Sequence, residues 1–265
     1  KNWLEAGEGF RLKTIRLRGE LSQGLVMGLE EVDCAGLWEG LDVTERLGVV
    51  KYDPPMKAAL QGMAKGNFPS FIPKTDQDRI QNCYNKVVDL DTTWEVSIKL
   101  EGSSMTIYKD LEGNMGVCSR NIDLKLGEAY PTSFERMYNE LKNTTYLDSL
   151  AKGYAIQGEL MGHGIQGNIE GFNKLKFFAY NVFDIYAQQY LSPEDARVFC
   201  ELIGIDCVPI LHTDMRIDNL TNQQLLDMAD GVSINATLRE GLVFKSNTTP
   251  HSFKVISNLY LLNGK

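Results

Sequence analysis

Residues 94–109 read WEVSIKLEGSSMTIYK and decide the fold. Two runs rich in β-branched and apolar side chains, residues 94–100 and 104–109, flank a short glycine turn, so the stretch predicts two β-strands. Lys99 lies at the end of the first strand, just before Gly102. A lysine in this position can be a nucleophile if desolvation or a neighbouring cation deprotonates its amine. Taken alone, a lysine at a strand end is more often simply solvated, so the rest of the chain has to support the assignment.

The pattern of the remaining chain predicts an α+β domain. Residues 10–29 begin with alternating basic and apolar side chains, which predicts a strand with a basic exposed face, and residues 30–90 are typical of loops and short helices. Capping residues at Ser192 and Thr221 and a glycine stop at Gly204 indicate two helices. Further strands are expected at 115–120, 154–160, 176–185, 238–245 and 252–256, and helices at 133–152, 192–204 and 221–230. Together, these strands and helices predict an α+β fold of antiparallel β-sheets flanked by helices.

Composition and charge exclude several classes of protein. The chain has 265 residues, of which 43% are hydrophobic and 23% charged, as expected of a globular domain with a full core rather than a disordered chain. Its longest nearly apolar run, residues 177–183, is too short to cross a bilayer. The net charge of −8 argues against non-specific coating of nucleic acid, although a local basic groove stays open. Five scattered cysteines exclude a closed disulfide framework and a zinc ribbon, and they predict a reducing intracellular compartment.

Five more segments place charged or aromatic residues on or beside apolar strands. They are Ser119-Arg120-Asn121 and residues 156–162 (IQGELMG), 178–185 (FAYNVFDI), 240–245 (EGLVFK) and 252–257 (SFKVIS). Together with the Lys99 segment, their order and rough spacing resemble the six motifs of the covalent nucleotidyltransferases, the superfamily of polynucleotide ligases and mRNA capping enzymes. The resemblance covers residues 13–262. Each motif is weak by itself, but six in the same order are a specific signal.

Two stretches narrow the resemblance to ATP-dependent RNA ligases. Residues 71–82, FIPKTDQDRIQN, are similar to a segment typical of these enzymes. Residues 16–25, RLRGELSQGL, resemble the stretch that joins an N-terminal OB module to the transferase domain in the nick-sealing, Deinococcus/Naegleria-type branch. The resemblance implies that residues 1–265 form a nucleotidyltransferase domain of the ATP-grasp-like ligase kind. Residues 1–30 would then be the remnant of a junction to an OB module that is missing from the chain.

The resemblance implies an ATP-dependent RNA ligase that joins 3′-OH and 5′-phosphate RNA ends. In that reaction the Lys99 amine attacks the α-phosphorus of ATP to give lysyl-AMP. AMP then moves to the 5′-phosphate of an RNA end, and the neighbouring 3′-hydroxyl displaces it. The implied substrates are ATP and RNA ends, or a nicked duplex with an RNA 3′-OH strand, and the implied metal is Mg²⁺ or Mn²⁺. No membrane partner is expected.

The resemblance also implies four catalytic residues, two lysines and two glutamates, and a third glutamate for the metal ion. Lys99 is the nucleophile, and Lys254 contacts the α-phosphate as a point charge that stabilises the transition state. Glu159 and Glu240 are expected to hold the metal ion through water molecules. Glu101 is expected to join them, although the family's first motif usually reads Lys-x-Asp-Gly. Glutamate keeps the charge of that aspartate but adds a methylene group.

The residues expected to bind ATP and AMP come from the same motifs. They are Arg79, Gln81, Ile98, Gly102, Arg120, Phe183, Val243 and Lys245. Arg79 and Arg120 suit phosphate and ribose contacts, because a planar guanidinium donates directional hydrogen bonds. Phe183 is expected to stack on one face of adenine and Val243 to pack on the other, although either could be an ordinary core residue. Lys245 is a weaker phosphate candidate at the end of a strand.

Three alternatives remain open at this point. A DNA ligase or a GTP-dependent mRNA capping nucleotidyltransferase would share the motifs, but residues 71–82 favour an RNA ligase. A non-catalytic RNA-binding module of the same fold is the third alternative, and the retention of Lys99, Glu159, Glu240 and Lys254 argues against it. Labelled ATP and GTP would separate these classes by the covalent adduct that each leaves on the protein.

Overall fold

The computed structural model describes residues 62–236 and 238–263, together with residues 15–17, 20–22, 28, 36–41, 43 and 46–48. The chain divides into two units, residues 1–58 and residues 59–265. In the first unit, β1 (Ile15–Leu17) pairs antiparallel with β2 (Glu20–Ser22), so part of the strand predicted at 10–29 is a pair of short strands. The predicted basic face of that strand lies outside the described side chains. The domain junction at residues 1–30 stays a prediction.

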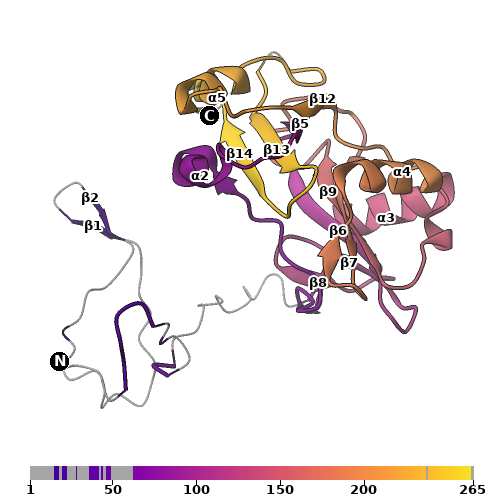
Figure 1. The fold of residues 1–265 in the computed structure, drawn as a ribbon. Helices are drawn as coiled ribbons and strands as arrows, with labels where there is room; N and C mark the ends of the chain where they lie inside the picture. Colours follow the sequence, from indigo (N-terminus) through magenta and orange to yellow (C-terminus); the bar gives the residue numbers. More distant parts are fainter. Residues whose placement is uncertain are drawn as a thin grey trace. The chain divides into compact units, whose positions relative to one another are not determined.

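The larger sheet of the second unit has seven strands in the order β11-β10-β9-β6-β7-β8-β3 (Figure 1), and every neighbouring pair is antiparallel. Its strands are β3 (Ala64–Asn67), β6 (Ser103–Lys109), β7 (Met115–Cys118), β8 (Ile122–Leu124), β9 (Tyr154–Met161), β10 (Lys176–Asp184) and β11 (Gln189–Tyr190). The strands predicted at 104–109, 154–160 and 176–185 are confirmed. The strand predicted at 115–120 ends at Cys118, because a turn follows in which the Ser119 N–H donates to the Ile122 carbonyl at 3.0 Å, and β8 begins after that turn.

The smaller sheet has five strands in the order β12-β5-β13-β14-β4. Its strands are β4 (Asp78–Arg79), β5 (Trp94–Lys99), β12 (Ile210–Met215), β13 (Gly241–Ser246) and β14 (Ser252–Ile256). Only the β14–β4 pair of this sheet is parallel. The strands predicted at 94–100 and 252–256 are confirmed, whereas the strand predicted at 238–245 begins three residues later. That strand begins late because the side chain and the N–H of Arg239 bond to carbonyls of residues 228–231 rather than to a neighbouring strand.

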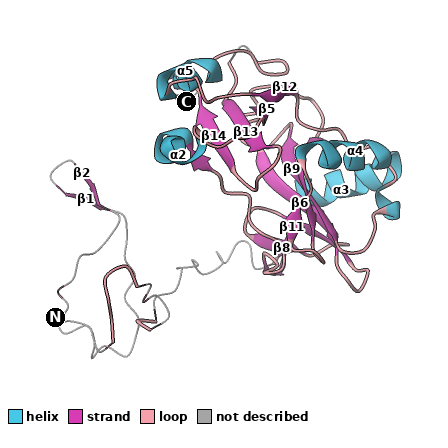
Figure 2. Cartoon of the chain, in the orientation of Figure 1, coloured by secondary structure: helices cyan, strands magenta, loops and turns pink. Residues whose placement is uncertain are grey.

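Helices flank both sheets (Figure 2). They are α2 (Ile80–Val87), α3 (Ser133–Thr144), the 3-10 helix η2 (Leu147–Ser149), α4 (Pro193–Ile203), α5 (Asn222–Ala229) and α6 (Asn258–Asn263). Ser192 and Thr221 cap α4 and α5 as predicted, and Gly204 ends α4 at a left-handed φ of 77°. The helix predicted at 133–152 stops at Thr144, because Thr145 is extended and turns its hydroxyl back onto the Leu141 carbonyl. No helix among the described residues is long and apolar enough to cross a membrane.

The apolar core of the smaller sheet explains why α2 and α5 pack on it. Trp94, Phe244 and Phe253 are fully buried between the strands and the two helices, with the Phe244 and Phe253 rings stacked 4.7 Å apart. The chain leaves this sheet at Lys99 and enters the larger sheet at Ser103. The crossing requires a glycine, because a Cβ atom at Gly102 would lie 2.4 Å from the Leu160 carbonyl oxygen. The turn predicted from the sequence therefore joins the two sheets.

Candidate active site

A cavity of about 570 Å³ is walled by both sheets and by residues 74–77. The smaller sheet contributes β5, β13 and β14, and the larger sheet contributes β6, β9 and β10. Six other predicted site residues share this wall with the four catalytic ones, and three predicted residues lie elsewhere. The cavity-lining members are Lys99, Glu159, Glu240, Lys254, Glu101, Ile98, Gly102, Arg120, Val243 and Lys245. The other three are Arg79, Gln81 and Phe183.

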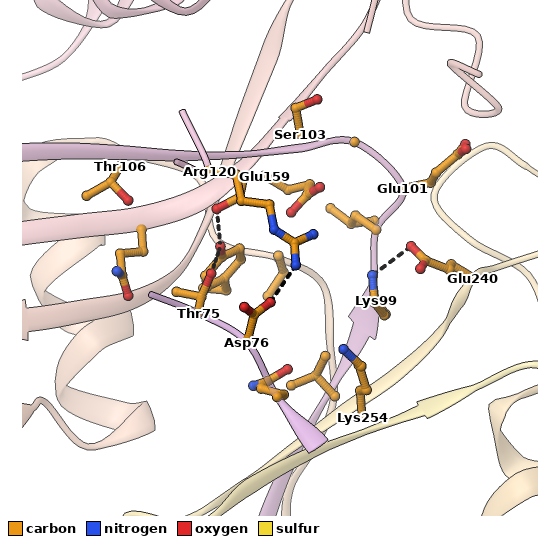
Figure 3. Close-up of a pocket in the computed structure, with 18 of the residues that line it drawn as sticks. Thr75, Asp76, Lys99, Glu101, Ser103, Thr106, Arg120, Glu159, Glu240 and Lys254 are labelled. Atoms are coloured by element: carbon orange, nitrogen blue, oxygen red, sulfur yellow. Dashed lines mark hydrogen bonds and ion pairs between the residues drawn. The ribbon is translucent and has the colours of Figure 1, made fainter. Parts of the chain in front are cut away.

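Lys99 and Glu240 form an ion pair at the centre of the cavity (Figure 3), with 2.7 Å between Lys99 Nζ and Glu240 Oε2. Strand pairing brings them together, because Lys99 lies opposite Gly241 in the β5–β13 ladder and Glu240 immediately precedes that glycine. Their side chains are 25% and 20% exposed, so both are reachable from solvent but largely surrounded by protein. Glu240 therefore holds the amine of Lys99 inside the cavity.

Glu159 faces the same pair of residues from the opposite sheet. It lies on β9 between Ser104 of β6 and Phe178 of β10. The pKa of Glu159 is raised to about 7, chiefly by burial and also by the charge of Glu240, while Lys99 and Arg120 act against the shift. The carboxyl groups of Glu159 and Glu240 therefore lie close enough to interact, with Lys99 beside them.

Lys254 adds a second cation to the wall formed by the smaller sheet. It lies opposite Val243 on β13 and beside Arg79 on β4. Burial lowers the pKa of Lys254, as do the nearby charges of Lys99, Arg79 and Arg120, while Asp76 acts in the opposite direction. Several cations therefore converge here, an arrangement that attracts a polyanion such as a triphosphate.

Arg79 and Gln81 do not line the cavity. Both side chains are exposed, Arg79 at the end of β4 and Gln81 in the first turn of α2. Arg79 remains within the electrostatic field of Lys254, whereas no contact connects Gln81 with the described part of the cavity wall. Their expected contacts with ATP stay predictions.

Arg120 lines the cavity and is held by an aspartate that the sequence reading did not single out. Its guanidinium donates to Asp76 at 2.6 Å (Figure 3). Both side chains are more than half exposed. Asp76 belongs to a segment that is tied to the larger sheet by Lys74, which donates to Asn121 at 3.5 Å, and by Thr75, which bonds to Tyr180 at 3.1 Å. The sequence marks residues 71–82 as typical of RNA ligases. Only the fold shows that residues 74–77 line the cavity and that Asp76 pairs with Arg120.

The structure places Phe183 in the core and Tyr180 in the cavity wall, so the prediction that Phe183 faces the cavity is wrong. Phe183 is 3% exposed and packs with Ile72 and Tyr108. The β9–β10 register shifts between Ala179 and Asn181, which leaves Tyr180 as the extra residue of a β-bulge. Bulges turn a side chain away from the regular alternation and are frequent beside active sites.

Three hydrogen bonds hold Tyr180 in the cavity wall. Its hydroxyl shares hydrogen bonds of 3.1 Å with Thr75 and with Ser104, and its carbonyl accepts a hydrogen bond from Lys245 Nζ. Burial lowers the pKa of Lys245 to about 8, against the opposing influence of Cys207 and Cys200. Lys245 thus holds the backbone of Tyr180, in addition to lining the cavity.

Glu101 lines the cavity but is turned away from Lys99 (Figure 3). Its carboxylate lies against Gly167, where a Cβ atom would be 3.3 Å from Oε1. Among the described residues, no three His, Cys, Asp or Glu side chains come close enough together to hold a metal ion directly. Glu159 and Glu240 still offer the hard oxygen donors that Mg²⁺ and Mn²⁺ prefer, so these two fit a metal ion held through water better than Glu101 does.

Two further residues of the cavity wall carry no signal in the sequence. Gln157 is fully buried opposite Thr106, and its amide donates to the Pro73 carbonyl at 2.8 Å. Tyr260 reaches the cavity from α6. Both would pass as ordinary core residues in a strand and a helix, because only the fold reveals that they face the cavity.

Comparison with known proteins agrees with this geometry. The family model described as RNA ligase matches residues 92–256. The structure of Naegleria gruberi RNA ligase with PPi is 40% identical, with a TM-score of 0.70 over 97% of this chain and 77% of that chain. A mutant of that enzyme with ATP and Mn is 40% identical, with a TM-score of 0.71 over 96% and 76%. Another mutant with AMP and Mn is 40% identical, with a TM-score of 0.69 over 95% and 76%. No curated protein matches the chain.

Proposed function

The chain belongs to the RNA ligase family and is an ATP-dependent RNA ligase, and we propose that Lys99 is the residue that takes AMP from ATP. The family match favours this enzyme over a DNA ligase, a capping enzyme and a non-catalytic binding module. One observation supports Lys99 above all others: its amine lies 2.7 Å from Glu240 in a cavity that also presents Lys254 and Glu159.

The first step follows from the positions of the two lysines. Lys99 Nζ, as a neutral amine, attacks the α-phosphorus of ATP, so that an N–P bond forms, the bond to the pyrophosphate oxygen breaks and pyrophosphate leaves. Lys254 approaches from the neighbouring strand and stabilises the negative charge that grows on the phosphorus centre. Glu240 keeps the amine of Lys99 pointed into the cavity before ATP arrives.

The second step transfers AMP to the 5′-phosphate of the RNA, and the third step joins the two RNA ends. A 5′-phosphate oxygen attacks the phosphorus of lysyl-AMP and releases the Lys99 amine, which gives an RNA-adenylate. The 3′-hydroxyl of the neighbouring end then attacks the RNA phosphorus, and AMP leaves. Arg120, on the rim of the cavity, has a guanidinium that can exchange Asp76 for a phosphate, because both side chains are exposed.

A divalent metal ion is assigned to Glu159 and Glu240, which would hold it through water. When bound, the ion neutralises charge on the triphosphate. The two carboxylates come from different sheets, and burial raises the pKa of Glu159 to about 7, so a cation brought between them would favour its charged form. This pairing suits Mg²⁺ or Mn²⁺, which keep several water ligands.

The nucleoside is assigned to the part of the cavity beside Tyr180. The Tyr180 ring, Ile98 and Val243 line this part, and Lys245 holds the Tyr180 backbone. A flat aromatic ring offers stacking to adenine. Tyr180 therefore takes the role that the sequence pattern assigned to Phe183.

The RNA is assigned as the ends of a nicked duplex, bound with the help of an N-terminal OB module. The support is indirect: the chain carries a net charge of −8, which disfavours a tight grip on a polyanion, and OB modules bind nucleic acid. A chain extended N-terminally by such a module should seal a nicked duplex faster than residues 1–265 at equal salt. Equal sealing rates would contradict the need for that module.

The assignment of the enzyme is tested by labelled nucleotides. Incubation with ATP and Mn²⁺ should give a covalent AMP adduct that survives denaturation, whereas GTP should give none. Adenylylated protein should then join a nick with an RNA 3′-OH strand faster than the matched nick with a DNA 3′-OH strand. A GMP adduct, or equal joining of both nicks, would contradict the proposed substrate.

A further inference from the structure

Glu170 connects a loop of the larger sheet with a loop that leads into the smaller sheet. It lies between β9 and β10 and is buried, with 4% of its surface exposed. Its Oε2 accepts hydrogen bonds from the N–H groups of Asn235 at 2.6 Å and Ala236 at 2.9 Å. Its backbone carbonyl accepts a third from the side-chain amide of Asn235 at 3.2 Å. Three hydrogen bonds therefore join the β9–β10 loop to the α5–β13 loop.

The β9–β10 loop ties Glu170 to the strand that carries Glu159. Glu159 lies two residues before the end of β9 and lines the cavity. The two ends of the loop touch, because a Cβ atom at Gly162 would lie 2.3 Å from a carbonyl oxygen of the returning chain. Around Glu170 itself, the Asn168 side chain donates to the Phe172 carbonyl at 3.1 Å and accepts from the Phe172 N–H at 3.2 Å. The loop is thus held in a defined shape on both sides of Glu170.

The α5–β13 loop makes a similar connection to Glu240. Within this loop the Ser233 N–H donates to the Ala236 carbonyl at 3.0 Å. The side chain and the N–H of Arg239 bond to carbonyls of residues 228–231, which anchors the end of the loop. Glu240 directly follows Arg239 and is the last residue before β13. A restraint at Ala236 is therefore applied four residues before the carboxylate that pairs with the amine in the cavity.

Glu170 makes these contacts with only one of its two carboxylate oxygens. Its Oε1 is buried and has no hydrogen-bond partner in the part of the chain that the structure describes, and such an oxygen destabilises the folded state. Glu135 of α3 is a matched case, because it is also 4% exposed, its Oε1 accepts from the Gly127 N–H at 2.5 Å and its Oε2 has no partner among the described residues. Glu135 is not part of the cavity wall and contacts neither loop of Glu170 in any of these bonds. It therefore provides a control for the loss of a buried carboxylate.

We propose that Glu170 is a positioning residue that fixes the α5–β13 loop to the β9–β10 loop and so sets the spacing of Glu240 from Glu159. Groups behind the metal ligands commonly determine how well those ligands bind the ion. The effect on metal binding rests on the proposed function, in which Glu159 and Glu240 hold the ion through water, whereas the effect on the backbone of Glu240 does not. Glu170 acts through the two loops and is assigned no contact with ATP or the metal ion.

The first experiment measures hydrogen exchange by NMR, without ATP or metal. In Glu170→Ala, the two N–H groups that lose their acceptor should exchange about tenfold faster, corresponding to one lost hydrogen bond. The buried Ser257 N–H donates to the Glu240 carbonyl at 2.9 Å and reports whether the effect reaches that residue. It should exchange about threefold faster in Glu170→Ala and at the normal rate in Glu135→Ala. Unchanged Ser257 exchange in Glu170→Ala, or an equal increase in Glu135→Ala, would overturn the proposal.

The second experiment measures lysyl-AMP formation in single turnovers at saturating ATP and increasing Mn²⁺. Glu170→Ala should raise the Mn²⁺ concentration at half-maximal rate about tenfold, the usual loss for a group that orients metal ligands, and should keep the maximal rate within about twofold. Glu170→Gln retains an acceptor oxygen for both N–H groups and should retain most of the Mn²⁺ affinity, and Glu135→Ala should retain all of it. A lower maximal rate in Glu170→Ala with an unchanged Mn²⁺ dependence would contradict the proposal, as would equal losses in Glu170→Ala and Glu170→Gln.

The two experiments separate this inference from the proposed function. If Ser257 exchange responds as expected but Glu159→Gln and Glu240→Gln leave the Mn²⁺ dependence unchanged, the metal assignment fails and the positioning of Glu240 by Glu170 stands. If those two variants lose Mn²⁺ affinity while Glu170→Ala changes neither Ser257 exchange nor the Mn²⁺ dependence, the metal assignment stands and the positioning role fails.

Discussion

The two sheets that wall the cavity contribute different chemistry. The smaller sheet provides Lys99 and Lys254, with Glu240 at the start of β13, on three neighbouring strands. The larger sheet provides Glu159 and the largely neutral groups around Tyr180. One wall therefore presents the reacting charges, and the other presents one carboxylate and a shaped binding surface.

This difference follows from how each wall is built. Regular antiparallel register is enough to set Lys99 against Glu240 and Lys254 against Val243. The larger sheet departs from regular register at Tyr180, where a bulge turns one ring into the cavity. The proposed reacting groups are thus placed by regular strand pairing, whereas the proposed nucleoside surface is placed by an interruption of that pairing.

The largest effect is expected at the strand end where the chain crosses between the sheets. Lys99 and Lys109 end successive strands, but Lys109 donates to the Leu150 carbonyl at 2.9 Å and lies outside the cavity. Lys99→Ala should reduce the AMP adduct by at least about a thousandfold, because the nucleophile is lost. Lys109→Ala should form the adduct at the normal rate. Equal losses in the two variants, measured with labelled ATP on denaturing gels, would show that folding and not chemistry is affected.

A smaller effect is expected from removing one carboxylate from either wall. Glu159→Gln and Glu240→Gln should each slow lysyl-AMP formation about a hundredfold, the usual loss for a positioned electrostatic group. The exposed Glu201 of α4 supplies the control, and Glu201→Gln should leave the rate unchanged. The measurement is the single-turnover rate at saturating ATP and Mn²⁺. A slower rate in only one of these two variants would contradict a metal ion that both glutamates hold.

The bulge predicts a division of roles between two aromatic residues of β10. Tyr180→Ala should raise the ATP concentration at half-saturation about tenfold, since a stacked ring contributes roughly 0.5–1.5 kcal/mol. Phe183→Ala should instead lower the free energy of unfolding by about 3–5 kcal/mol, because it opens a cavity in the core. ATP titrations and urea unfolding of both variants distinguish the two outcomes. Weaker ATP binding in Phe183→Ala with unchanged stability would restore the sequence-based assignment.

The smallest effect concerns Lys245, which supports the bulge from the smaller sheet. Burial lowers the pKa of Lys245 to about 8 in the folded chain, below that of a free lysine. Above pH 8 the folded state has therefore released this proton while the unfolded state still holds it up to about pH 10. The unfolding free energy gains at most about 1.4 kcal/mol per pH unit in that window. Lys245→Met should show a flatter rise between pH 8 and 10 in urea unfolding. Identical slopes in both proteins would mean that Lys245 is not buried in this way.

Much of the smaller sheet could be predicted from the sequence, because its functional residues lie on regular strands. The alternation around Lys99 and Lys254 predicts both strands, and the order of the motifs brings Glu240 to the same place. The regular alternation of apolar and polar residues is enough to predict the strands on which these residues lie.

The larger sheet and the rim of the cavity could be predicted only in part. The alternation of β10 gives no sign of the bulge that places Tyr180 in the cavity wall and leaves Phe183 in the core. Tyr260 reaches the cavity from a segment that nothing local marks, and Asp76 lies in a recognisable segment whose sequence does not show that it pairs with Arg120. Such contacts depend on tertiary packing, which periodicity does not encode.

The assignment of Lys99 as the residue that carries AMP is tested most directly by locating the adduct. The chain would be incubated with ATP and Mn²⁺, digested at a pH that preserves phosphoramidates, and sequenced by tandem mass spectrometry. The account predicts AMP on Lys99, within the peptide that also contains Glu101. AMP on Lys254, on Lys245 or on any other lysine, with Lys99 unmodified, would contradict it.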